Sequence, residues 1–287
     1  MTNITGHTSL YGLLGSPVAH SISPMMHNES FRILDIDSVY LCFDVDTTTL
    51  KDALTGLKAI GIKGFNCTMP DKNLMCELAD ELSMAASLVG AVNTVKNENG
   101  KLIGHMTDGV GYMRAAADAG FDIIGKNMTL LGAGGAASAI CAQAAIDGVK
   151  EINMFSIRDQ FFDRAVKLAD NITSQTNCKV NLYDLEDKTM LKNCIDNSHI
   201  LTNATSVGMA PNTDACILPD NSYLHEGLIV SDVIYNPRET KLITMAKEAS
   251  LPTFNGLYML LYQGAEAFKI WTGKDMPVEI IKEKYFS

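Results

Sequence analysis

The amino-acid sequence predicts an α/β protein made of two units. Short strand-like segments alternate with helix-like segments from residue 9 onward, a second series of the same kind begins near residue 126, and a long apolar helix closes the chain. Such alternation is typical of a largely parallel sheet whose strands are joined by crossover helices. We therefore expect two α/β units, with the last helix packing back on the first.

The first series contains three strands and two helices. Its first helix has Pro24 at the first helical position and Ser23 as the N-cap, both typical of a helix start. Apolar residues at positions 50, 53, 54, 57 and 60 mark the second helix. The expected elements are a strand over 9–15, a helix over 24–34, a strand over 39–45, a helix over 50–60 and a strand over 64–69 that Pro70 closes.

The second series begins with an apolar strand that runs into a glycine-rich turn. The expected elements are a strand over 127–131, the turn over 132–137, a helix to residue 148, a strand over 151–156, a helix over 160–170, and strands over 200–203 and 228–233. In the last helix, apolar residues at positions 257, 260, 261, 264, 268 and 271 form one continuous stripe.

Composition excludes several classes of protein. Among 287 residues, 47% are apolar and 20% are charged, which excludes a disordered chain. The net charge of −10 argues against a nucleic-acid partner, because binding to phosphates needs a basic surface. The seven cysteines show no CxxC or zinc-ligand spacing, so we expect reduced thiols and no metal site. Neither a signal peptide nor a membrane span is recognisable, which predicts a cytoplasmic protein with a small-molecule partner.

The turn after the strand at 127–131 fits the GxGxxA pattern of a dinucleotide-binding site. Gly132 allows a tight turn, Gly134 lets the backbone approach a diphosphate, and Ala137 lets the following helix pack close to the strand. Because a strand precedes the turn and a helix follows it, the context supports the pattern. The sequence therefore predicts a Rossmann-type, doubly wound dinucleotide-binding domain. The alternative is a glycine-rich turn without a ligand.

The residues that read the adenosine ribose are expected just past the strand at 151–156. An acidic side chain there accepts hydrogen bonds from a ribose 2′-hydroxyl, whereas an arginine favours a 2′-phosphate. Both types are present, as Arg158 and Asp159. The residues alone therefore leave open the choice between NAD and NADP, and also the reading of both side chains as solvated loop charges.

Polar residues gather in four further segments. Ser21 and Ser23 lie at a helix start, where hydroxyl and amide donors favour a carboxylate, although Ser23 could also serve only as an N-cap. Asn66 and Thr68 alternate on one face of the expected third strand, and Lys72 follows just beyond it. The segments 90–94 and 107–109 add polar groups next to glycine.

Taken in this order, the segments resemble the shikimate dehydrogenase family. The resemblance covers almost the whole chain, from about residue 10 to 275, and rests on residues 15–28, 66–72, 90–94, 107–111, 132–135, 235–237 and 263–264. Residues 158–163 and 271–275 are similar to the quinate/shikimate dehydrogenase subgroup. Two positions depart from the family pattern. Met106 stands where the family has asparagine, and Ile157 stands where NADP-specific members have arginine.

The resemblance implies a role for each site residue. Lys72 and Asp108 form the catalytic acid–base pair, and the order in which they take the proton stays open. The implied substrate-binding residues are Ser21, Ser23, Asn66, Thr68, Lys72, Asn93, Asp108, Tyr235 and Gln263. The implied cofactor-binding residues are Gly132, Ala133, Gly134, Gly135, Ala136, Ser156, Arg158, Asp159, Thr205, Val233, Gly256 and Met259.

The implied activity is the reversible oxidation of shikimate to 3-dehydroshikimate, or of quinate, in chorismate biosynthesis or quinate metabolism. Asp159 together with Ile157 favours NAD over NADP as cofactor. We expect a substrate-binding domain over 1–111 completed by 255–287, a dinucleotide-binding domain over 112–254, and the active site in the cleft between them. A homodimer is compatible with the sequence.

Two other functions compete with this one. A dehydrogenase similar to methylene-tetrahydrofolate dehydrogenases would share the two-domain organisation and a lysine, but the paired serines favour a more compact carboxylate. A sensor that binds a cyclitol acid and a dinucleotide would not need to keep both Lys72 and Asp108.

Overall fold

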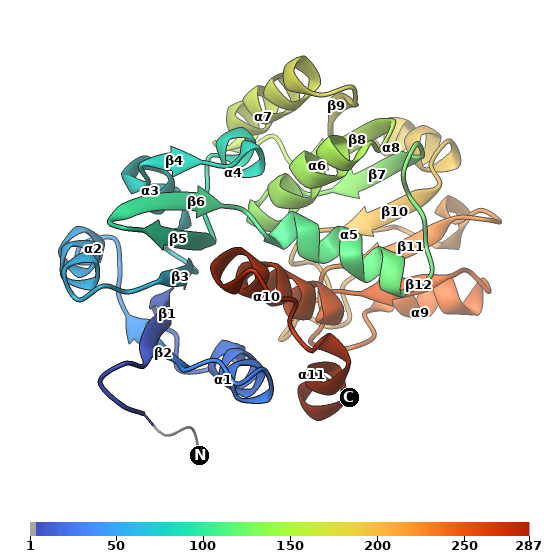
Figure 1. Cartoon of the computed structure of the whole chain (residues 1–287). Coiled ribbons are helices and arrows are strands. Elements are labelled where there is room, and N and C mark those ends of the chain that lie inside the picture. Colours follow the sequence, from blue (N-terminus) through green and yellow to red (C-terminus); the bar gives the residue numbers. More distant parts are fainter. Residues whose placement is uncertain (1–3, 287) are drawn as a thin grey trace. The chain divides into compact units, whose positions relative to one another are not determined.

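The computed structural model describes residues 4–286, and the chain divides into two compact units. The first unit is formed by Met1–Thr107 with Leu261–Ser287, and the second by Asp108–Leu260 (Figure 1). The sequence places the domain boundaries near residues 111 and 255, whereas the compact units meet in the chain at 107–108 and at 260–261.

The first unit is built on a six-stranded sheet with the order β2-β1-β3-β5-β6-β4. Its elements before residue 107 are β1 (Ser9–Gly15), α1 (Ser23–Ile33), β2 (Ser38–Asp44), α2 (Leu50–Ala59), β3 (Gly64–Cys67), α3 (Lys72–Leu78), β4 (Glu81–Leu82), α4 (Met84–Val89), β5 (Thr94–Glu98) and β6 (Lys101–His105). The five elements predicted up to residue 69 are all present, with ends shifted by at most two residues.

The sheet of the first unit is mixed, which corrects the expectation of a largely parallel sheet. β1 pairs in parallel with β2 and β3, but β5 runs antiparallel to both β3 and β6. β5 and β6 form a hairpin closed by Asn99 and Gly100, whose φ angles are 55° and 93°. Positive φ at both central residues is the geometry that a tight two-residue hairpin requires, and Asn-Gly is the dipeptide that adopts it most readily.

Two local predictions in the first unit are wrong. Ser23 is the first residue of α1 rather than its N-cap, because Ile22 before it already has helical backbone angles. Ile22 occupies the N-cap position, and the hydroxyl of Ser23 hydrogen-bonds Tyr40 on β2 instead. Ile60 does not belong to the buried stripe of α2, since the helix ends at Ala59 and Ile60 is 68% exposed.

The second unit contains a fully parallel six-stranded sheet (Figure 1). Its order is β12-β11-β10-β7-β8-β9, which is the doubly wound Rossmann order and confirms the predicted fold class. The elements are α5 (Asp108–Asp118), β7 (Asn127–Leu131), α6 (Gly135–Asp147), β8 (Glu151–Ser156), α7 (Phe162–Gln175), β9 (Lys179–Asp184), α8 (Lys188–Asp196), β10 (Ile200–Asn203), the 3-10 helix η1 (Asn221–Tyr223), β11 (Ile229–Asp232), α9 (Lys241–Glu248) and β12 (Thr253–Asn255).

The C-terminal helix α10 (Leu257–Thr272) passes from the second unit into the first, and α11 (Val278–Tyr285) follows it. In the first unit, the Trp271 indole donates a hydrogen bond to the Val95 carbonyl over 2.9 Å. The same ring packs so closely on β3 that a Cβ at Gly64 would lie 2.5 Å from it. Residues 261–286 therefore complete the core of the first unit.

All seven cysteines are free thiols, and those at positions 67, 141, 178 and 194 are buried. Within residues 4–286, no helix combines the length and the apolar character that a membrane crossing requires.

Candidate active site

A loop before α1 and the first turn of that helix hold the paired serines. The backbone N–H of Ser23 donates to the Ser21 hydroxyl oxygen over 3.2 Å, which fixes the two residues against each other. The Ser23 side chain hydrogen-bonds the hydroxyl of Tyr40 on β2. Ser21 is half-buried and Ser23 is buried, so the serine pair lies at the rim of the unit rather than on an open surface.

Tyr40 links the serine pair to β3 by a second hydrogen bond. Its hydroxyl donates to Asn66 Oδ1 over 2.8 Å, and burial raises the pKa of Tyr40 well above its usual value. The amide of Asn66 in turn donates to Thr94 Oγ1 over 2.9 Å and to the Asn93 carbonyl over 3.1 Å. A buried tyrosine hydroxyl therefore links the serine pair to the polar residues of the central strands.

Asn93 extends the same network to α10. Its side chain donates to Thr107 Oγ1 over 3.0 Å and to Gln263 Oε1 over 3.5 Å, and it accepts the Thr107 backbone N–H over 2.8 Å. Thr94 and Thr107 are in hydrogen-bond contact at 3.2 Å. Four predicted site residues, Ser23, Asn66, Asn93 and Gln263, thus belong to one polar relay, completed by Tyr40, Thr94 and Thr107.

Thr68 and Lys72 lie on the segment that follows β3. Thr68 is one residue beyond the end of that strand, and its N–H bonds the Leu14 carbonyl over 2.9 Å. Gly15 has φ +155°, and a Cβ there would lie 2.3 Å from Thr68 Cγ2, so this close approach requires glycine. Lys72 opens α3, and its carbonyl accepts the Val92 N–H over 2.9 Å, which ties it to the neighbour of Asn93.

Asp71 stands beside Lys72 as a buried carboxylate. Neither of its oxygens has a hydrogen-bond partner within the described part of the chain. Burial, together with the charge of Asp46, raises the pKa of Asp71 above its usual range. The resemblance assigned no role to this residue.

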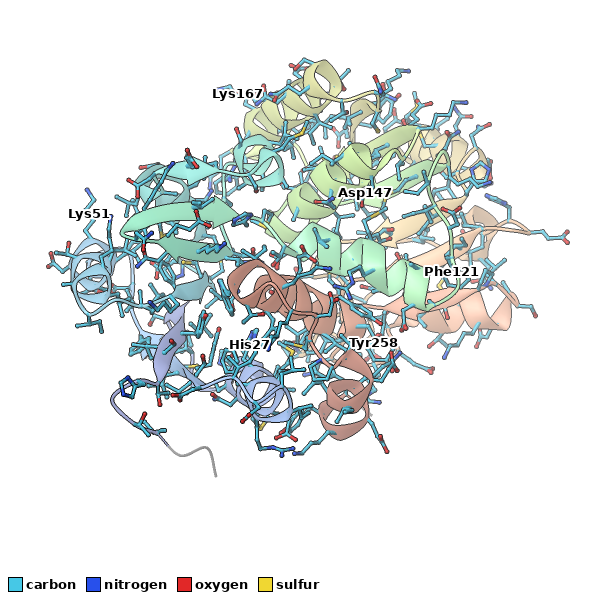
Figure 2. All side chains as sticks on the ribbon, viewed as in Figure 1. His27, Lys51, Phe121, Asp147, Lys167 and Tyr258 are labelled. Atoms are coloured by element: carbon cyan, nitrogen blue, oxygen red, sulfur yellow. The ribbon has the colours of Figure 1, made fainter. Side chains whose placement is uncertain are left out.

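His27 (labelled in Figure 2) is a fully buried residue of α1 in the same unit. Its ring stacks on that of Tyr40 with centroids 4.5 Å apart, and the rings of Trp271 and Phe268 lie 5.2 and 6.2 Å away. Among the residues described, none accepts or donates a hydrogen bond at either ring nitrogen. Burial lowers the pKa of His27 to about 3, so the ring is neutral and supports Tyr40 as an aromatic surface.

Asp108 is the first residue of α5 in the second unit, and this helix is held firmly. The hydroxyl of Tyr112 contacts Thr202 Oγ1 at 2.6 Å and Ser231 Oγ at 2.9 Å, which ties α5 to β10 and β11. A Cβ at Gly109 would lie 2.2 Å from the Ala139 carbonyl oxygen on α6. The backbone that carries Asp108 is therefore fixed within its unit.

The glycine turn lies where the order of the second sheet reverses, between β7 and β10. Gly132 has φ +109°, and a Cβ there would lie 2.9 Å from the Ala204 carbonyl oxygen. Around Gly134 and Gly135 the space is open, and in the described chain no side chain caps the start of α6. The backbone N–H groups at the N-terminus of this 13-residue helix can bind a diphosphate, because the glycines there have no side chain to block its approach. These residues therefore fit a dinucleotide.

The other predicted cofactor residues gather at the same edge of the sheet. A Cβ at Gly132 would lie 3.1 Å from Thr205 Cγ2, and one at Gly256 would lie 1.8 Å from the Val233 carbonyl oxygen. Met259 is in the first turn of α10, just after Gly256. Tyr235 follows β11 and is 47% exposed. The second unit thus brings together the glycine turn, Thr205, Val233 and Gly256.

The segment after β8 has a defined arrangement rather than two loose charges. Asp159 Oδ1 accepts the Phe161 N–H over 2.8 Å. The Arg158 guanidinium forms an ion pair with Asp184 Oδ2 at 2.9 Å and lies over the Phe162 ring, 4.7 Å from its centroid. Ile157 is 52% exposed and offers no charge.

Comparison with known proteins decides the family. Residues 13–95 match the model of the shikimate dehydrogenase substrate binding domain, and residues 256–284 match that of the shikimate 5′-dehydrogenase C-terminal domain. A curated shikimate dehydrogenase (NADP(+)) from Listeria innocua is 53% identical over 99% of this chain and 97% of its own length. The chain belongs to the shikimate dehydrogenase family. The family predicted from the sequence is therefore confirmed.

Further members of the family agree with this assignment. A quinate/shikimate dehydrogenase from Escherichia coli is 46% identical over 98% of both chains. The crystal structure of a shikimate 5-dehydrogenase from Listeria monocytogenes in complex with shikimate and NAD matches with a TM-score of 0.96 at 53% identity, covering 99% of this chain and 98% of that one. The protein is thus an NAD(P)-dependent oxidoreductase with a nicotinamide cofactor, built from an N-terminal substrate-binding domain and a Rossmann-like domain.

Three residues of the polar relay escaped the sequence-based prediction of the site. Tyr40 reads as an ordinary strand residue, because a tyrosine in a half-buried strand is typical of a core. The signal that could have marked it is that a buried tyrosine hydroxyl needs a partner, and the neighbouring strand offers Asn66. Thr94 and Thr107 lie inside the family segments at 90–94 and 107–111, next to the residues that were predicted.

Proposed function

We propose that this protein catalyses the reversible oxidation of shikimate to 3-dehydroshikimate, in chorismate biosynthesis or in quinate metabolism. The observation that carries the proposal is the polar relay of the first unit, from Ser23 through Tyr40 and Asn66 to Asn93 and Gln263. A ring acid with several hydroxyl groups needs a set of fixed donors and acceptors, and the relay fixes amide and hydroxyl groups by mutual hydrogen bonds.

The binding roles follow from the chemistry of each group. Ser21 donates its hydroxyl hydrogen to the substrate carboxylate. Ser23 binds the same carboxylate by turning its single hydroxyl hydrogen from Tyr40 to the substrate. Tyr235 contributes near the carboxylate and the cofactor. Asn66, Thr68, Asn93 and Gln263 bind the ring hydroxyls, because amide and hydroxyl groups can both donate and accept.

Lys72 and Asp108 carry the proton transfer at the reacting hydroxyl. In oxidation this pair takes the hydroxyl proton as the carbonyl forms, and in reduction it returns a proton to the new alcohol. A bound nicotinamide would supply the hydride chemistry at the ring carbon. The first turn of α6 and Gly134 would hold the diphosphate, and Asp159 would accept hydrogen bonds from the adenosine ribose.

NAD is the favoured cofactor in this proposal, and NADP the second. Asp159 opposes a 2′-phosphate, which carries close to two negative charges, and Ile157 supplies no cation. The structure from Listeria monocytogenes at 53% identity was solved with NAD, although the similar curated Listeria enzymes carry NADP(+) in their names. A homodimer and a cytoplasmic location stay predictions.

The deciding experiment follows absorbance of the reduced nicotinamide with shikimate and quinate, each combined with NAD+ and NADP+. We expect turnover of shikimate, with kcat/KM for NAD+ at least equal to that for NADP+. A tenfold preference for NADP+ would contradict the cofactor assignment, and absence of turnover in every combination would favour the sensor. Asp159→Ala should narrow or invert the preference, at about 1.4 kcal/mol of differential binding for each tenfold change.

A further inference from the structure

Arg158, the single cation of the segment 156–159, is engaged by partners outside that segment. Its Nε bonds Asp184 Oδ2 at 2.9 Å, and its guanidinium lies over the Phe162 ring at 4.7 Å. Asp184 is the last residue of β9, where it pairs with Ser156 at the end of β8. The carboxylate that holds Arg158 therefore comes from the neighbouring strand.

Asp184 is itself fixed in place. Its Oδ1 accepts the N–H of Glu186 over 2.9 Å, and its carbonyl accepts the N–H of Asp187 over 3.1 Å. The side chain of Asp184 is 24% exposed, whereas that of Arg158 is 68% exposed. A carboxylate locked by its own turn and partly shielded from water is the anchor of the pair, and the arginine is the partner that adapts to it.

We propose that Asp184 is a positioning residue that shifts this enzyme toward NAD, by engaging the guanidinium that a 2′-phosphate would need. This inference rests on the proposed assignment of residues 156–159 to the adenosine ribose. A 2′-phosphate is bound best by an arginine free to present its two-pronged donor edge. In this protein one of those donors is already bonded to a carboxylate, and the net charge of the Arg158–Asp184 pair is zero.

The consequence is that Asp159 does not act alone. Asp159 adds a negative charge beside the ribose, and Asp184 neutralises the nearest cation from the next strand. A sequence inspected only over 156–159 shows a contested site with one cation and one anion, whereas the structure shows that the cation is already paired. The preference for NAD should then fall when Asp184 loses its charge, even with Asp159 intact.

The test is binding of NAD+ and NADP+ to the free enzyme by isothermal titration calorimetry, without any shikimate. Asp184→Asn removes the charge but keeps an oxygen for the Glu186 N–H, so the turn is preserved. We expect the ratio of Kd for NADP+ to Kd for NAD+ to fall by about three- to tenfold. This is the size expected for the loss of one partly shielded ion pair. Asp187→Asn is the matched control, because Asp187 caps α8 through Met190 N–H and the substitution makes the same charge change.

A double-mutant cycle shows whether Asp184 acts through Arg158. Arg158→Ala should weaken NADP+ binding at least about threefold more in the Asp184→Asn protein than in the wild type, because only there is the guanidinium available. The proposal would be overturned if Arg158→Ala weakened NADP+ binding equally in the wild type and in Asp184→Asn. It would also be overturned if Asp184→Asn left the ratio of the two dissociation constants unchanged, or if Asp187→Asn shifted that ratio by the same factor. Since the titration uses no shikimate, a failure of the proposed activity alone leaves this result intact.

Discussion

Replacing His27 by phenylalanine should make the folded protein more resistant to acid. His27 is buried among the rings of Tyr40, Phe268 and Trp271, so a phenylalanine of similar size can occupy the same space. The substitution removes a group that must be neutral in the folded state, while it keeps the ring that supports Tyr40. The difference between the two proteins should therefore appear as a change in pH dependence.

The magnitude follows from the pKa of His27, which burial lowers from 6.5 to about 3. Between these values the unfolded chain binds a proton that the folded protein does not, so the free energy of unfolding falls as pH falls through this window. Well above pH 6.5, His27 is neutral in both the folded and the unfolded protein and does not change the free energy of unfolding. Because of His27, this free energy should fall by about 2 kcal/mol from pH 8 to pH 5, and by roughly 4–5 kcal/mol from pH 8 to pH 3.

The assay is urea unfolding followed by circular dichroism at pH 8 and pH 5. Between these two pH values, the free energy of unfolding of His27→Phe should fall by about 2 kcal/mol less than that of the wild type. His7→Phe is the matched control, because His7 is exposed and the change of side chain is the same. Equal losses in His27→Phe and the wild type would refute the reasoning, since they would mean that the buried ring does not resist protonation.

Four further substitutions separate the roles in the proposed site. Lys72→Ala should lower kcat by about 10²–10⁴ with a much smaller change in KM, and a pure KM effect in steady-state kinetics would make Lys72 a binding residue. Ser21→Ala should instead raise the KM for shikimate by about ten- to a hundredfold, the value of one hydrogen bond to a charged group. Tyr40→Phe should cost about 1–3 kcal/mol in urea unfolding, because it leaves a buried amide oxygen unpaired. Gly109→Ala should destabilise by about 1–3 kcal/mol and lower kcat, since the new Cβ meets the Ala139 carbonyl oxygen at 2.2 Å; an unchanged melting temperature would contradict this packing.

The doubly wound sheet could be predicted from the sequence because its inner strands are short apolar runs. β7, β8 and β10 are buried along almost their whole length, and each was predicted within a residue of its ends. β9 (Lys179–Asp184) was missed, because it is an edge strand with polar residues and only one buried position. A half-exposed edge strand does not produce the apolar run by which the others were found.

The mixed sheet of the first unit has a recognisable signal in the sequence. Asn99-Gly100 between two short strands is a strong hairpin indication, and a hairpin forces its two strands to run antiparallel. The helix start at Ser23 could not be resolved in the same way. A serine before a proline is typical of an N-cap, and only the helical backbone of Ile22 shows that the helix begins earlier.

The sequence motifs predict residues of the candidate site, but they do not predict the hydrogen bonds that join these residues. Family segments gave Ser23, Asn66, Asn93 and Gln263, and the structure joins all four in one network. The joining residue Tyr40 lies outside those segments, on β2, so no local pattern could identify it. Contacts between residues that are distant in sequence depend on strand order, and the sequence gives that order only indirectly.

The polar relay ends directly before Asp108, the proposed acid–base residue of the second unit. Its last threonine, Thr107, is held by Asn93 through both its N–H and its hydroxyl, and the next residue is Asp108. Within the second unit, the backbone of Asp108 is held by α5, because Tyr112 of this helix contacts Thr202 on β10 and Ser231 on β11. Met106 is buried directly before Thr107, and the bonds between Thr107 and Asn93 do not involve its side chain. Substitutions in the relay should consequently change kcat as well as KM, since any shift of Thr107 is passed along the chain to the proposed acid–base residue.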